Sequence, residues 1–454
     1  MTNSALYRDA AERAIAYLET AAERRVQPAP EAVAALRGFA EPLPAGPTDP
    51  FETLRRLDDI GSPASVVTNG PRFFGFVIGG ALPATVAAAW LATAWDQNAG
   101  LFAAAPAATV LEEVSLAWLV ELFGLPAGTA GAFVTGATMA NFTALAAARQ
   151  HVLAEAGWDV EADGLQGAPP LTVITSAEAH PSLVKSLGLL GLGRQRRTLI
   201  PTDDQGRVRP AALAEALHPV SGPAIVCLQA GNVNTGSFDP LTELIPLARA
   251  RGAWVHIDGA FGLWALAAPE RAHLAAGIQG ADSWATDAHK WLNTPYDSGL
   301  AFIRHAAALR GAMTLNAPYL PQGDHREPSQ FVPELSRRAR GVEVWAALHS
   351  LGRAGLAELI ERNCRQAARF AAGLRAAGYA VLNDVVLNQV LVSFGEPEQT
   401  RHVIAAIQAE GTCWAGPTVW HEQTAMRISV SSWATTDADV ERSLEAMLRA
   451  ARAA

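Results

Sequence analysis

Short apolar runs that are typical of β-strands alternate with longer helical stretches through the central part of the chain. The runs are AGAFVTG, LTVITS, RQRRTLIP, AIVCLQA, AWVHIDG, SWATDA and GLAFIRH. Stretches rich in Ala and Leu, long enough for helices, lie between most of them. This alternation favours a mostly parallel sheet covered by helices on both faces. We therefore predict an α/β fold.

The sequence on either side of this region has a different texture. Residues 1–83 combine helical patterns with Pro-rich pieces, which predicts an N-terminal helical arm, and residues 84–341 form the large domain. Residues 342–454 begin with a long helical stretch and continue with the strand-like runs VLVSFG and MRISVSS. They predict a small C-terminal α+β domain. The polar, Pro-rich segment 316–336 predicts a functional loop or lid.

Composition and charge exclude several classes of protein. The 454 residues carry a formal charge of −9, and their Lys and Arg residues are scattered, which argues against a nucleic-acid partner. The apolar stretch 81–95 is too short to span a membrane. Cys227, Cys364 and Cys413 form no CxxC pair, so neither a disulfide framework nor a metal site is expected. The N-terminal sequence lacks a secretion signal, and we predict a cytoplasmic protein.

The most specific motif is SWATDAHKWLN, in which a strand-like run ends in a turn that carries His289 and Lys290. A lysine held near a sheet edge and partly removed from water has a reactive amine, which can form a Schiff base with an aldehyde cofactor. Taken alone, Lys290 is more simply interpreted as an ordinary surface lysine, and only the other motifs change that interpretation.

Two polar residues follow other apolar strands. Asp258 ends the run AWVHID, where a buried carboxylate needs a cation or a donor as its partner. A pyridinium nitrogen is such a partner, and a helix or turn cap is the alternative. His180 follows the run LTVITS, where it could stack on an aromatic cofactor, although a lone histidine is more often structural.

The run AGAFVTG leads through a glycine turn into a strong helix that begins near Ala137 and Thr138. Backbone N–H groups at a helix start, together with the Thr138 hydroxyl, bind phosphate well, and the small Ala137 lets the anion approach. A simple helix cap at Thr138 is the alternative. These four elements all fall at carboxyl ends of strands, where α/β sheets bind their ligands.

Taken together, the motifs resemble those of the group II decarboxylases that depend on pyridoxal 5′-phosphate (PLP). That family has the aspartate-aminotransferase-like fold (fold type I), and the resemblance extends from about Arg72 onward. It is carried by GPRFFGFVIGGALPA, APAATVLEE, FVTGATMANFTALAAAR, SAEAHPSLVKS, GNVNTGSFDP, HIDGAFG, DAHKWLN and MRISVSSW.

The resemblance implies a role for each matching residue. Lys290 carries PLP as a Schiff base, Asp258 pairs with the pyridine nitrogen, and His180 lies over the ring as the third catalytic residue. The other implied cofactor contacts are Ala260 on the opposite ring face, Ala137, Thr138 and His289 at the phosphate, and Asn232, which stands where the family often has Thr. The family is homodimeric, which implies a homodimer here.

One family feature is missing from this sequence. Members carry a Tyr on a mobile loop, where it protonates the substrate carbon, but the matching segment HREPSQFVPELSRRAR has none. Phe331 is its only aromatic residue, His325 is the candidate proton donor, and Tyr319 matches a different, structural Tyr. In plant relatives, loss of the loop Tyr accompanies a switch from amine to aldehyde formation.

The resemblance implies decarboxylation of an L-amino acid to an amine and CO₂. The run FFGF (73–76), which contains Phe73, Phe74 and Phe76, favours an aromatic or bulky substrate together with Trp90 and Trp95, although all of them could instead be core residues. Arg72 could bind an acidic substrate, but a surface or interface position is the stronger interpretation. The alternatives are other PLP chemistry on this scaffold, such as an aldehyde synthase, aldolase or aminotransferase, and a non-catalytic PLP-binding protein.

Overall fold

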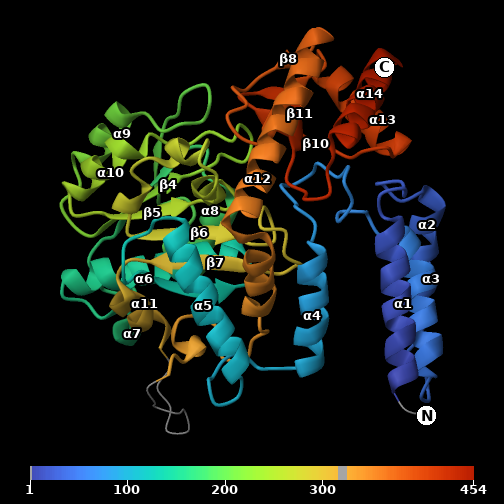
Figure 1. Cartoon of the computed structure of the whole chain (residues 1–454). Helices are drawn as coiled ribbons and strands as arrows, with labels where there is room; N and C mark the ends of the chain where they lie inside the picture. The colour runs from blue at the N-terminus through green and yellow to red at the C-terminus, as the bar shows by residue number, and fades with distance from the viewer. Residues whose placement is uncertain (1–2, 315–324, 454) are drawn as a thin grey trace. The chain divides into compact units, whose positions relative to one another are not determined.

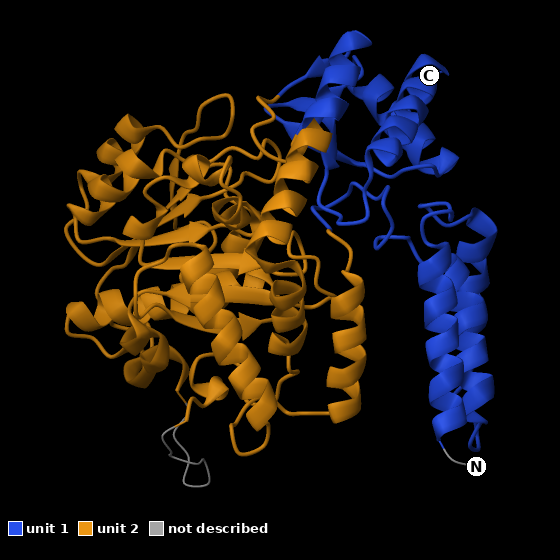
Figure 2. Cartoon of the chain, viewed as in Figure 1, with its two compact units in different colours: residues 1–78, 368–382, 390–454 blue, residues 79–367, 383–389 orange. Residues whose placement is uncertain are grey.

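The computed structural model describes residues 3–314 and 325–453, which divide into two compact units (Figure 2). One unit consists of residues 79–367 and 383–389. The other consists of residues 1–78, 368–382 and 390–454, so the N-terminal helices and the C-terminal sheet belong to the same unit. From the sequence we predicted domain boundaries at residues 83 and 341. The two compact units divide the chain at other residues, and the predicted domains stay a prediction.

A seven-stranded sheet forms the centre of the first unit, in the order β1-β7-β6-β5-β4-β2-β3 (Figure 1). Its strands are β1 (Ala130–Val134), β2 (Thr172–Ser176), β3 (Thr198–Ile200), β4 (Ala224–Gln229), β5 (Trp254–Asp258), β6 (Ser283–Asp287) and β7 (Gly299–Ile303). Only β7 runs against its neighbours. The predicted mostly parallel sheet is confirmed, and each of the seven apolar runs forms one of its strands.

Helices enclose this sheet. They are α4 (Pro83–Trp95), α5 (Pro106–Leu122), α6 (Ala137–Glu155), α7 (Val160–Asp163), α8 (Pro181–Leu189), α9 (Pro210–Leu217), α10 (Leu241–Arg249), α11 (Ala306–Met313) and α12 (Gly341–Ala376), with short 3₁₀ turns at Gly262–Ala267, Ala272–Ala275, Ile278–Gly280 and Pro328–Gln330. Helix α12 extends into the second unit and has a kink at Gly352.

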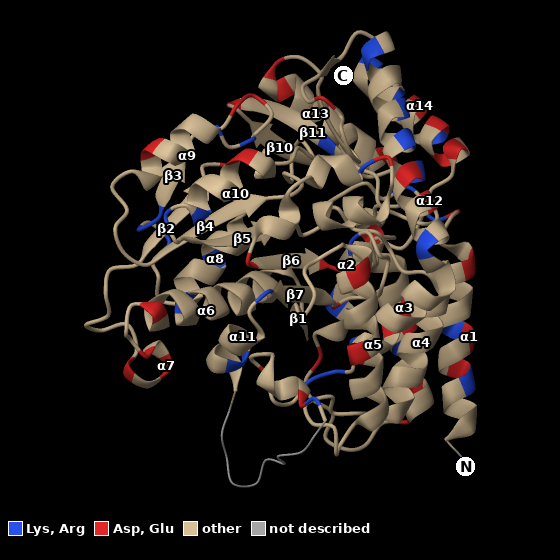
Figure 3. Ribbon diagram, turned by 60° about the vertical axis from the view of Figure 1, so that its left-hand side comes forward, with Lys and Arg blue, Asp and Glu red and all other residues tan. Residues whose placement is uncertain are grey.

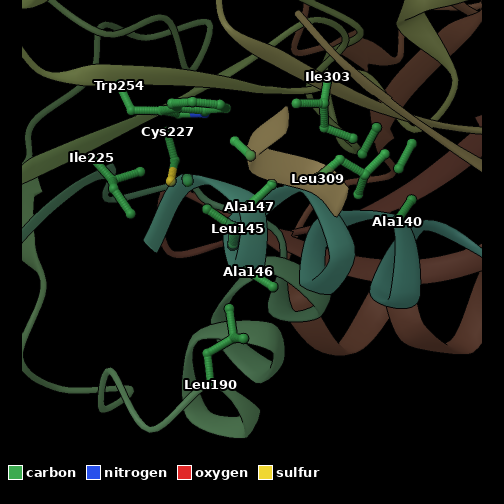
Figure 4. Close-up of a cluster of buried hydrophobic side chains, with 14 of the residues drawn as sticks. Ala140, Leu145, Ala146, Ala147, Leu190, Ile225, Cys227, Trp254, Ile303 and Leu309 are labelled. Atoms are coloured by element: carbon green, nitrogen blue, oxygen red, sulfur yellow. The ribbon is translucent and has the colours of Figure 1, made fainter. Parts of the chain in front are cut away.

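Both faces of the sheet are buried, because neighbouring strand residues point to opposite sides. On β7, Ala301 and Ile303 pack in the cluster formed with α6 and α11 (Figure 4). Phe302 points the other way and meets Phe123 edge to face, just after α5. This two-sided burial explains why the strands are continuous apolar runs rather than alternating ones.

The second unit holds a four-stranded sheet and helices from both ends of the chain. Its elements are α1 (Ser4–Thr20), α2 (Pro30–Ala35), a 3₁₀ turn (Leu36–Phe39), α3 (Pro50–Ala64), β8 (Ala380–Val381), β9 (Gln389–Ser393), α13 (Pro397–Glu410), β10 (Gly416–Trp420), β11 (Gln423–Ser429) and α14 (Asp437–Ala453). Arg13 on α1 pairs with Asp9 on its own helix and Asp58 on α3, where basic and acidic residues are mixed (Figure 3).

Arg72 is buried within this second unit, so its predicted surface position is wrong. Its guanidinium donates to the carbonyls of Ala22 and Thr412 and pairs with Asp439 at 3.0 Å. A buried guanidinium is stable only when its N–H groups are paired, and these partners lie on segments far apart in the sequence. Arg72 therefore ties the chain's two ends together within the unit.

Among the described residues, no helix has the length and apolar character that a membrane span requires.

Candidate active site

The residues predicted for the site lie after parallel strands, and the carboxyl ends of these strands meet at one edge of the sheet. Gly136 follows β1, His180 follows β2, Asp258 ends β5, and Lys290 follows β6. Open α/β sheets bind their ligands at this edge, because the loops there converge and helix N-termini point toward them. The structure therefore brings residues from four separate motifs to one region.

Helix α6 begins at Ala137 with no side-chain cap on its first turn. The backbone N–H groups at Ala137 and Thr138 therefore carry the partial positive charge of a helix N-terminus. A Cβ on Gly136 would lie 3.1 Å from the ring of His289, and a Cβ on Gly299 would collide with the Gly136 backbone. Glycines at these two positions let β7 and the His289 turn approach the start of α6.

Lys290 lies on a turn that is held in place from several sides. Its Nζ is 3.2 Å from the carboxylate of Asp287, which is almost completely buried. The indole of Trp264 donates to the Asp287 carbonyl, and the next residue, Trp291, anchors the turn in the core. A Cβ on Gly79 would collide with the carbonyl oxygen of Lys290, so only glycine fits there.

His289 is oriented by hydrogen bonds on the same turn. Its Nδ1 accepts the backbone N–H of Ser298 at 3.0 Å, so a neutral ring carries its proton on Nε2. Nε2 lies 3.6 Å from Asp287, and Tyr296 stacks on the ring with centroids 4.3 Å apart. Burial lowers the pKa of His289 despite the opposing effect of Asp287. A neutral His289 can donate from Nε2.

Asp258 is a buried carboxylate whose hydrogen bonds come from neutral donors. Asn141 Nδ2 donates to its Oδ2 at 3.1 Å, and the Ala260 N–H donates to its Oδ1 at 3.2 Å. Burial raises the pKa of Asp258, while the positive potential of His180 and these two donors oppose that rise. A cationic ligand group beside Asp258 would stabilise the carboxylate further.

His180 is the N-cap residue of α8, which is a structural role. The same cap orients its ring for the functional role predicted from the sequence. Its Nδ1 accepts the Ser182 N–H at 3.2 Å and lies 2.7 Å from the Ser182 hydroxyl. A neutral ring therefore holds its proton on Nε2. The cap fixes the ring's direction.

Asn232 is bound within its own turn. Its Oδ1 accepts the N–H groups of Asn234 and Thr235, and its Nδ2 lies 3.4 Å from the Gln229 side chain. These bonds stabilise the turn after β4 (Ala224–Gln229). A contact between Asn232 and a cofactor stays a prediction.

The arrangement fits PLP by three features of the described residues. The N-terminus of α6 suits a phosphate, Asp258 suits a protonated ring nitrogen, and the Lys290 amine suits an aldehyde. Oδ1 of Asp287 is a buried oxygen without a hydrogen-bond partner in the described structure, which marks a polar atom beside Lys290 available to a bound group. The residues thus match all three functional parts of the cofactor.

The segment that lacks the family Tyr is described from His325 onward, and Tyr319 lies outside the described residues. The ring of His325 stacks on Phe102 at 3.8 Å, and Glu327 accepts the Phe102 N–H. Arg326 donates to the carbonyl of Gly131 on β1 (Ala130–Val134) and covers the ring of Phe331. These contacts fix the segment beside the edge strand, and the role of His325 as a proton donor stays a prediction.

The aromatic residues considered for a substrate pocket have different environments. Phe73 and Phe74 are buried in the unit that contains the N-terminal helices, which agrees with a core role. Phe76 is 60% exposed, and Trp90 and Trp95 on α4 (Pro83–Trp95) are 42% and 45% exposed, so the interpretation of these three as core residues is wrong.

Sequence reasoning missed Asp287 and Asn141. Asp287 could have been found by the rule that identified Asp258, because it too is an acid at the end of an apolar strand. Asn141 stands one turn into α6, where a buried amide among alanines is itself a signal.

A mostly parallel α/β sheet with a lysine, an aspartate and an uncapped helix start at one edge is the arrangement expected of PLP enzymes of fold type I. Within that class, residues 62–395 match the model of the pyridoxal-dependent decarboxylase conserved domain. The chain therefore belongs to the pyridoxal-dependent decarboxylase family, whose cofactor is PLP. The family inferred from the motifs is confirmed.

The relatives agree with this assignment. The acidic amino acid decarboxylase GADL1 of Bos taurus is 30% identical over 68% of this chain and 60% of its own length. The aromatic-L-amino-acid decarboxylase of Bacillus atrophaeus is 30% identical over 71% of this chain and 67% of its own length. The chain thus spans about two thirds or less of these relatives.

Solved structures confirm the predicted fold type. The structure of Oryza sativa TDC with PLP and tryptamine superposes with a TM-score of 0.90, and the comparison covers 98% of each chain at 23% identity.

Proposed function

We propose that this protein is a PLP-dependent carboxy-lyase that converts an L-amino acid to its amine and CO₂. The observation that carries the proposal is the convergence of Lys290, Asp258 and the uncapped start of α6 (Ala137–Glu155) at one sheet edge. When bound, PLP supplies an electron sink for the pair released as the bond between Cα and the carboxylate breaks. The residues of the chain decide which bond of Cα is placed to break.

Each catalytic residue has a separate task in this proposal. Lys290 holds the cofactor covalently, and Asp258 keeps the ring nitrogen protonated. His180, whose proton lies on Nε2, donates to the substrate carboxylate and restricts its orientation. Asp287, 3.2 Å from the Lys290 amine, stabilises that amine as a cation whenever it is released.

For the other cofactor contacts we keep the assignments made from the sequence. Ala137, Thr138 and His289 bind the phosphate, Ala260 packs against the ring, and Asn232 is a further contact. A Cβ on Gly136 would lie 3.1 Å from the His289 ring, so His289 lies next to the start of α6. Its Nε2–H can donate a hydrogen bond, which supports a role in binding the phosphate. Ala260 follows Asp258 closely, which supports its place beside the ring.

For the substrate we propose an L-amino acid with an aromatic or bulky side chain. The relatives carry names that specify acidic and aromatic substrates, so the family leaves this choice to the individual site. The Arg72 guanidinium is buried and already paired with Asp439 and the Thr412 carbonyl, so it does not serve as the partner of an acidic substrate side chain.

A screen of CO₂ release tests the reaction and the substrate together. Purified protein with added PLP is assayed with the twenty amino acids, 2,4-diaminobutyrate and dihydroxyphenylalanine, while amine, ammonia and peroxide are measured in parallel. We expect CO₂ and amine in equal amounts, with an aromatic substrate turned over fastest.

The outcomes separate the two parts of the proposal. Fastest turnover of an acidic or diamino substrate contradicts only the aromatic preference. Ammonia and peroxide in place of amine indicate an aldehyde synthase, and the absence of CO₂ with every substrate overturns the carboxy-lyase.

We further propose that two copies of the chain form a homodimer. Large apolar side chains are exposed on the neighbouring elements α4 and α5 (Pro106–Leu122), and surfaces of this kind are typical of protein interfaces. They are Trp90, Leu91, Trp95, Val110 and Trp118. Because these side chains lie on the surface of two helices, they support a second copy of the chain as the partner. We also propose that the protein is cytoplasmic.

Sedimentation velocity tests the homodimer. We expect one species of twice the chain mass at micromolar concentration, and a shift toward monomer when Trp90 and Leu91 are both changed to Ser. Exchange of the exposed Leu199, on the edge strand β3 (Thr198–Ile200), for Ser is the control and should leave the mass unchanged. A wild-type monomer at these concentrations contradicts the proposal.

A further inference from the structure

Strand β5 (Trp254–Asp258) buries a line of polar atoms on one of its faces. Residues 254, 256 and 258 share a face because strand side chains alternate, and Trp254 packs in the apolar cluster with α6 (Figure 4). His256 is completely buried between Trp254 and Asp258. A buried imidazole is costly unless its nitrogens are hydrogen-bonded, so the line requires partners.

Those partners form one continuous chain of hydrogen bonds. Trp254 Nε1 donates to Ser283 Oγ at 2.9 Å, and Ser283 Oγ lies 2.9 Å from His256 Nδ1. His256 Nε2 lies 2.8 Å from Asn141 Oδ1, and Asn141 Nδ2 donates to Asp258 Oδ2 at 3.1 Å. All five residues are buried. The chain thus joins the start of β5 to the carboxylate at its end.

The two ends of this chain determine its direction. The indole of Trp254 can only donate, so the Ser283 hydroxyl accepts from it and is left to donate to His256 Nδ1. A neutral His256 then carries its proton on Nε2 and donates to Asn141 Oδ1. Asn141 in turn presents its N–H group to Asp258, and an ionised carboxylate can only accept. Every donor therefore points toward Asp258.

The reverse direction is disfavoured by the indole. It requires Asp258 to be protonated on Oδ2 and to donate to a flipped Asn141 amide, and His256 to donate from Nδ1 to Ser283. The Ser283 oxygen would then face two N–H donors, and its own proton would lose its acceptor. A non-titrating indole at the far end of β5 thus penalises protonation of Asp258 at Oδ2, and the N–H of Asn141 that it holds in place binds an ionised carboxylate more strongly than a neutral carboxyl group.

We propose that Trp254, Ser283, His256 and Asn141 are positioning residues that hold Asp258 in its ionised form through a hydrogen-bond chain of fixed direction. The inference rests on the proposed function only for the ligand that Asp258 meets, a protonated pyridine nitrogen. Oδ2 is engaged by Asn141 and Oδ1 by the Ala260 N–H, so the carboxylate is fixed in place. A fixed carboxylate offers its remaining lone pairs in one direction, toward the site.

Exchange of Trp254 for Phe tests the proposal, because it removes the terminal N–H and keeps an aromatic ring. Protonation of Asp258 is followed in the cofactor-free protein by the infrared band of a protonated carboxyl group, as the difference from the same protein carrying Asp258→Asn. We expect the pH midpoint to rise by about one unit, a tenfold change in proton affinity. PLP should bind more weakly in the pH range between the two midpoints, where Asp258 is protonated in the variant and ionised in the wild type.

Trp284→Phe is the matched control. Trp284 is equally buried on the neighbouring strand, and its Nε1 donates to the Ile278 carbonyl at 3.1 Å, outside the chain. Both variants lose one indole hydrogen bond, so a merely structural effect is the same in both. The other titratable groups that act on Asp258, which are His180, Asp287 and Cys227, are unchanged in both variants. Ser283→Ala, which removes the middle of the chain, should raise the midpoint as Trp254→Phe does and serves if that variant folds poorly.

The outcomes separate this inference from the proposed function. A midpoint that is the same for Trp254→Phe or Ser283→Ala as for Trp284→Phe overturns the chain, even if the enzyme decarboxylates amino acids. A raised midpoint in a protein that binds no PLP supports the chain and contradicts the proposed function.

Discussion

Replacement of Lys290 by Ala is expected to abolish covalent attachment of PLP and to lower turnover on the order of 10³-fold or more. The reason is geometric, because the Lys290 amine lies at the carboxyl edge of the sheet beside the buried carboxylate of Asp287. The loss should appear as a loss of the absorbance of bound cofactor and of CO₂ release together.

Because the chain contains few lysines, the residue that carries the cofactor can be assigned directly by mass spectrometry. The sequence contains two lysines, Lys185 and Lys290. Reduction of the PLP-loaded protein with borohydride, followed by mass spectrometry of its peptides, should label the peptide with Lys290 alone. Lys185→Arg, on α8 (Pro181–Leu189), is the control and should keep both label and turnover. Label on Lys185, or normal turnover of Lys290→Ala, contradicts the assignment.

Most of the large sheet could be predicted because its strands carry a simple signal. Strands buried on both faces are continuous apolar runs, so β4 (Ala224–Gln229) and β5 stand out between helical stretches. Strand β10 (Gly416–Trp420) escaped prediction, because two of its residues are exposed and Pro417 interrupts its pattern. Fold class therefore followed from local sequence where burial was complete.

The site was predictable only in part, for a related reason. Lys290, Asp258 and His180 each break an apolar pattern at a strand end, and this break is visible in one sequence. Asn141 and Ser283 matter through partners distant in the sequence, Asp258 and His256, and no local pattern reports such pairs. Arg72 was misplaced for the same reason, since its partners come from both ends of the chain.

His256 is expected to make the folded protein less stable as the pH falls below neutral. Burial lowers the pKa of His256 from 6.5 to about 3. Between these values the unfolded chain binds a proton at His256 and the folded chain does not, so acidification favours unfolding. The slope is at most about 1.4 kcal/mol of unfolding free energy per pH unit. At pH 6.5 the unfolded histidine is only half protonated, so a fall from pH 6.5 to 5 should cost about 1.6 kcal/mol through this residue alone.

His256→Gln isolates that contribution, because glutamine offers a donor and an acceptor but does not titrate. We expect the free energy of unfolding by urea, measured on the cofactor-free protein, to fall about 1.6 kcal/mol less in His256→Gln than in the wild type over this range. Other titrating groups are common to both proteins and cancel. His218→Gln, which replaces an exposed histidine, is the matched control for the substitution itself. Parallel curves for His256→Gln and the wild type would contradict a buried neutral imidazole.

Protonation of His256 would also disrupt the hydrogen-bond chain that ends at Asp258. A protonated His256 donates from both nitrogens, so Nδ1–H would face the Ser283 hydroxyl and the fixed direction would be lost. Because burial lowers the pKa of His256 to about 3, the imidazole stays neutral wherever the protein is folded near neutral pH. The cost in acid stability and the ionised state of Asp258 thus have one origin, the burial of a neutral histidine between an indole and a carboxylate.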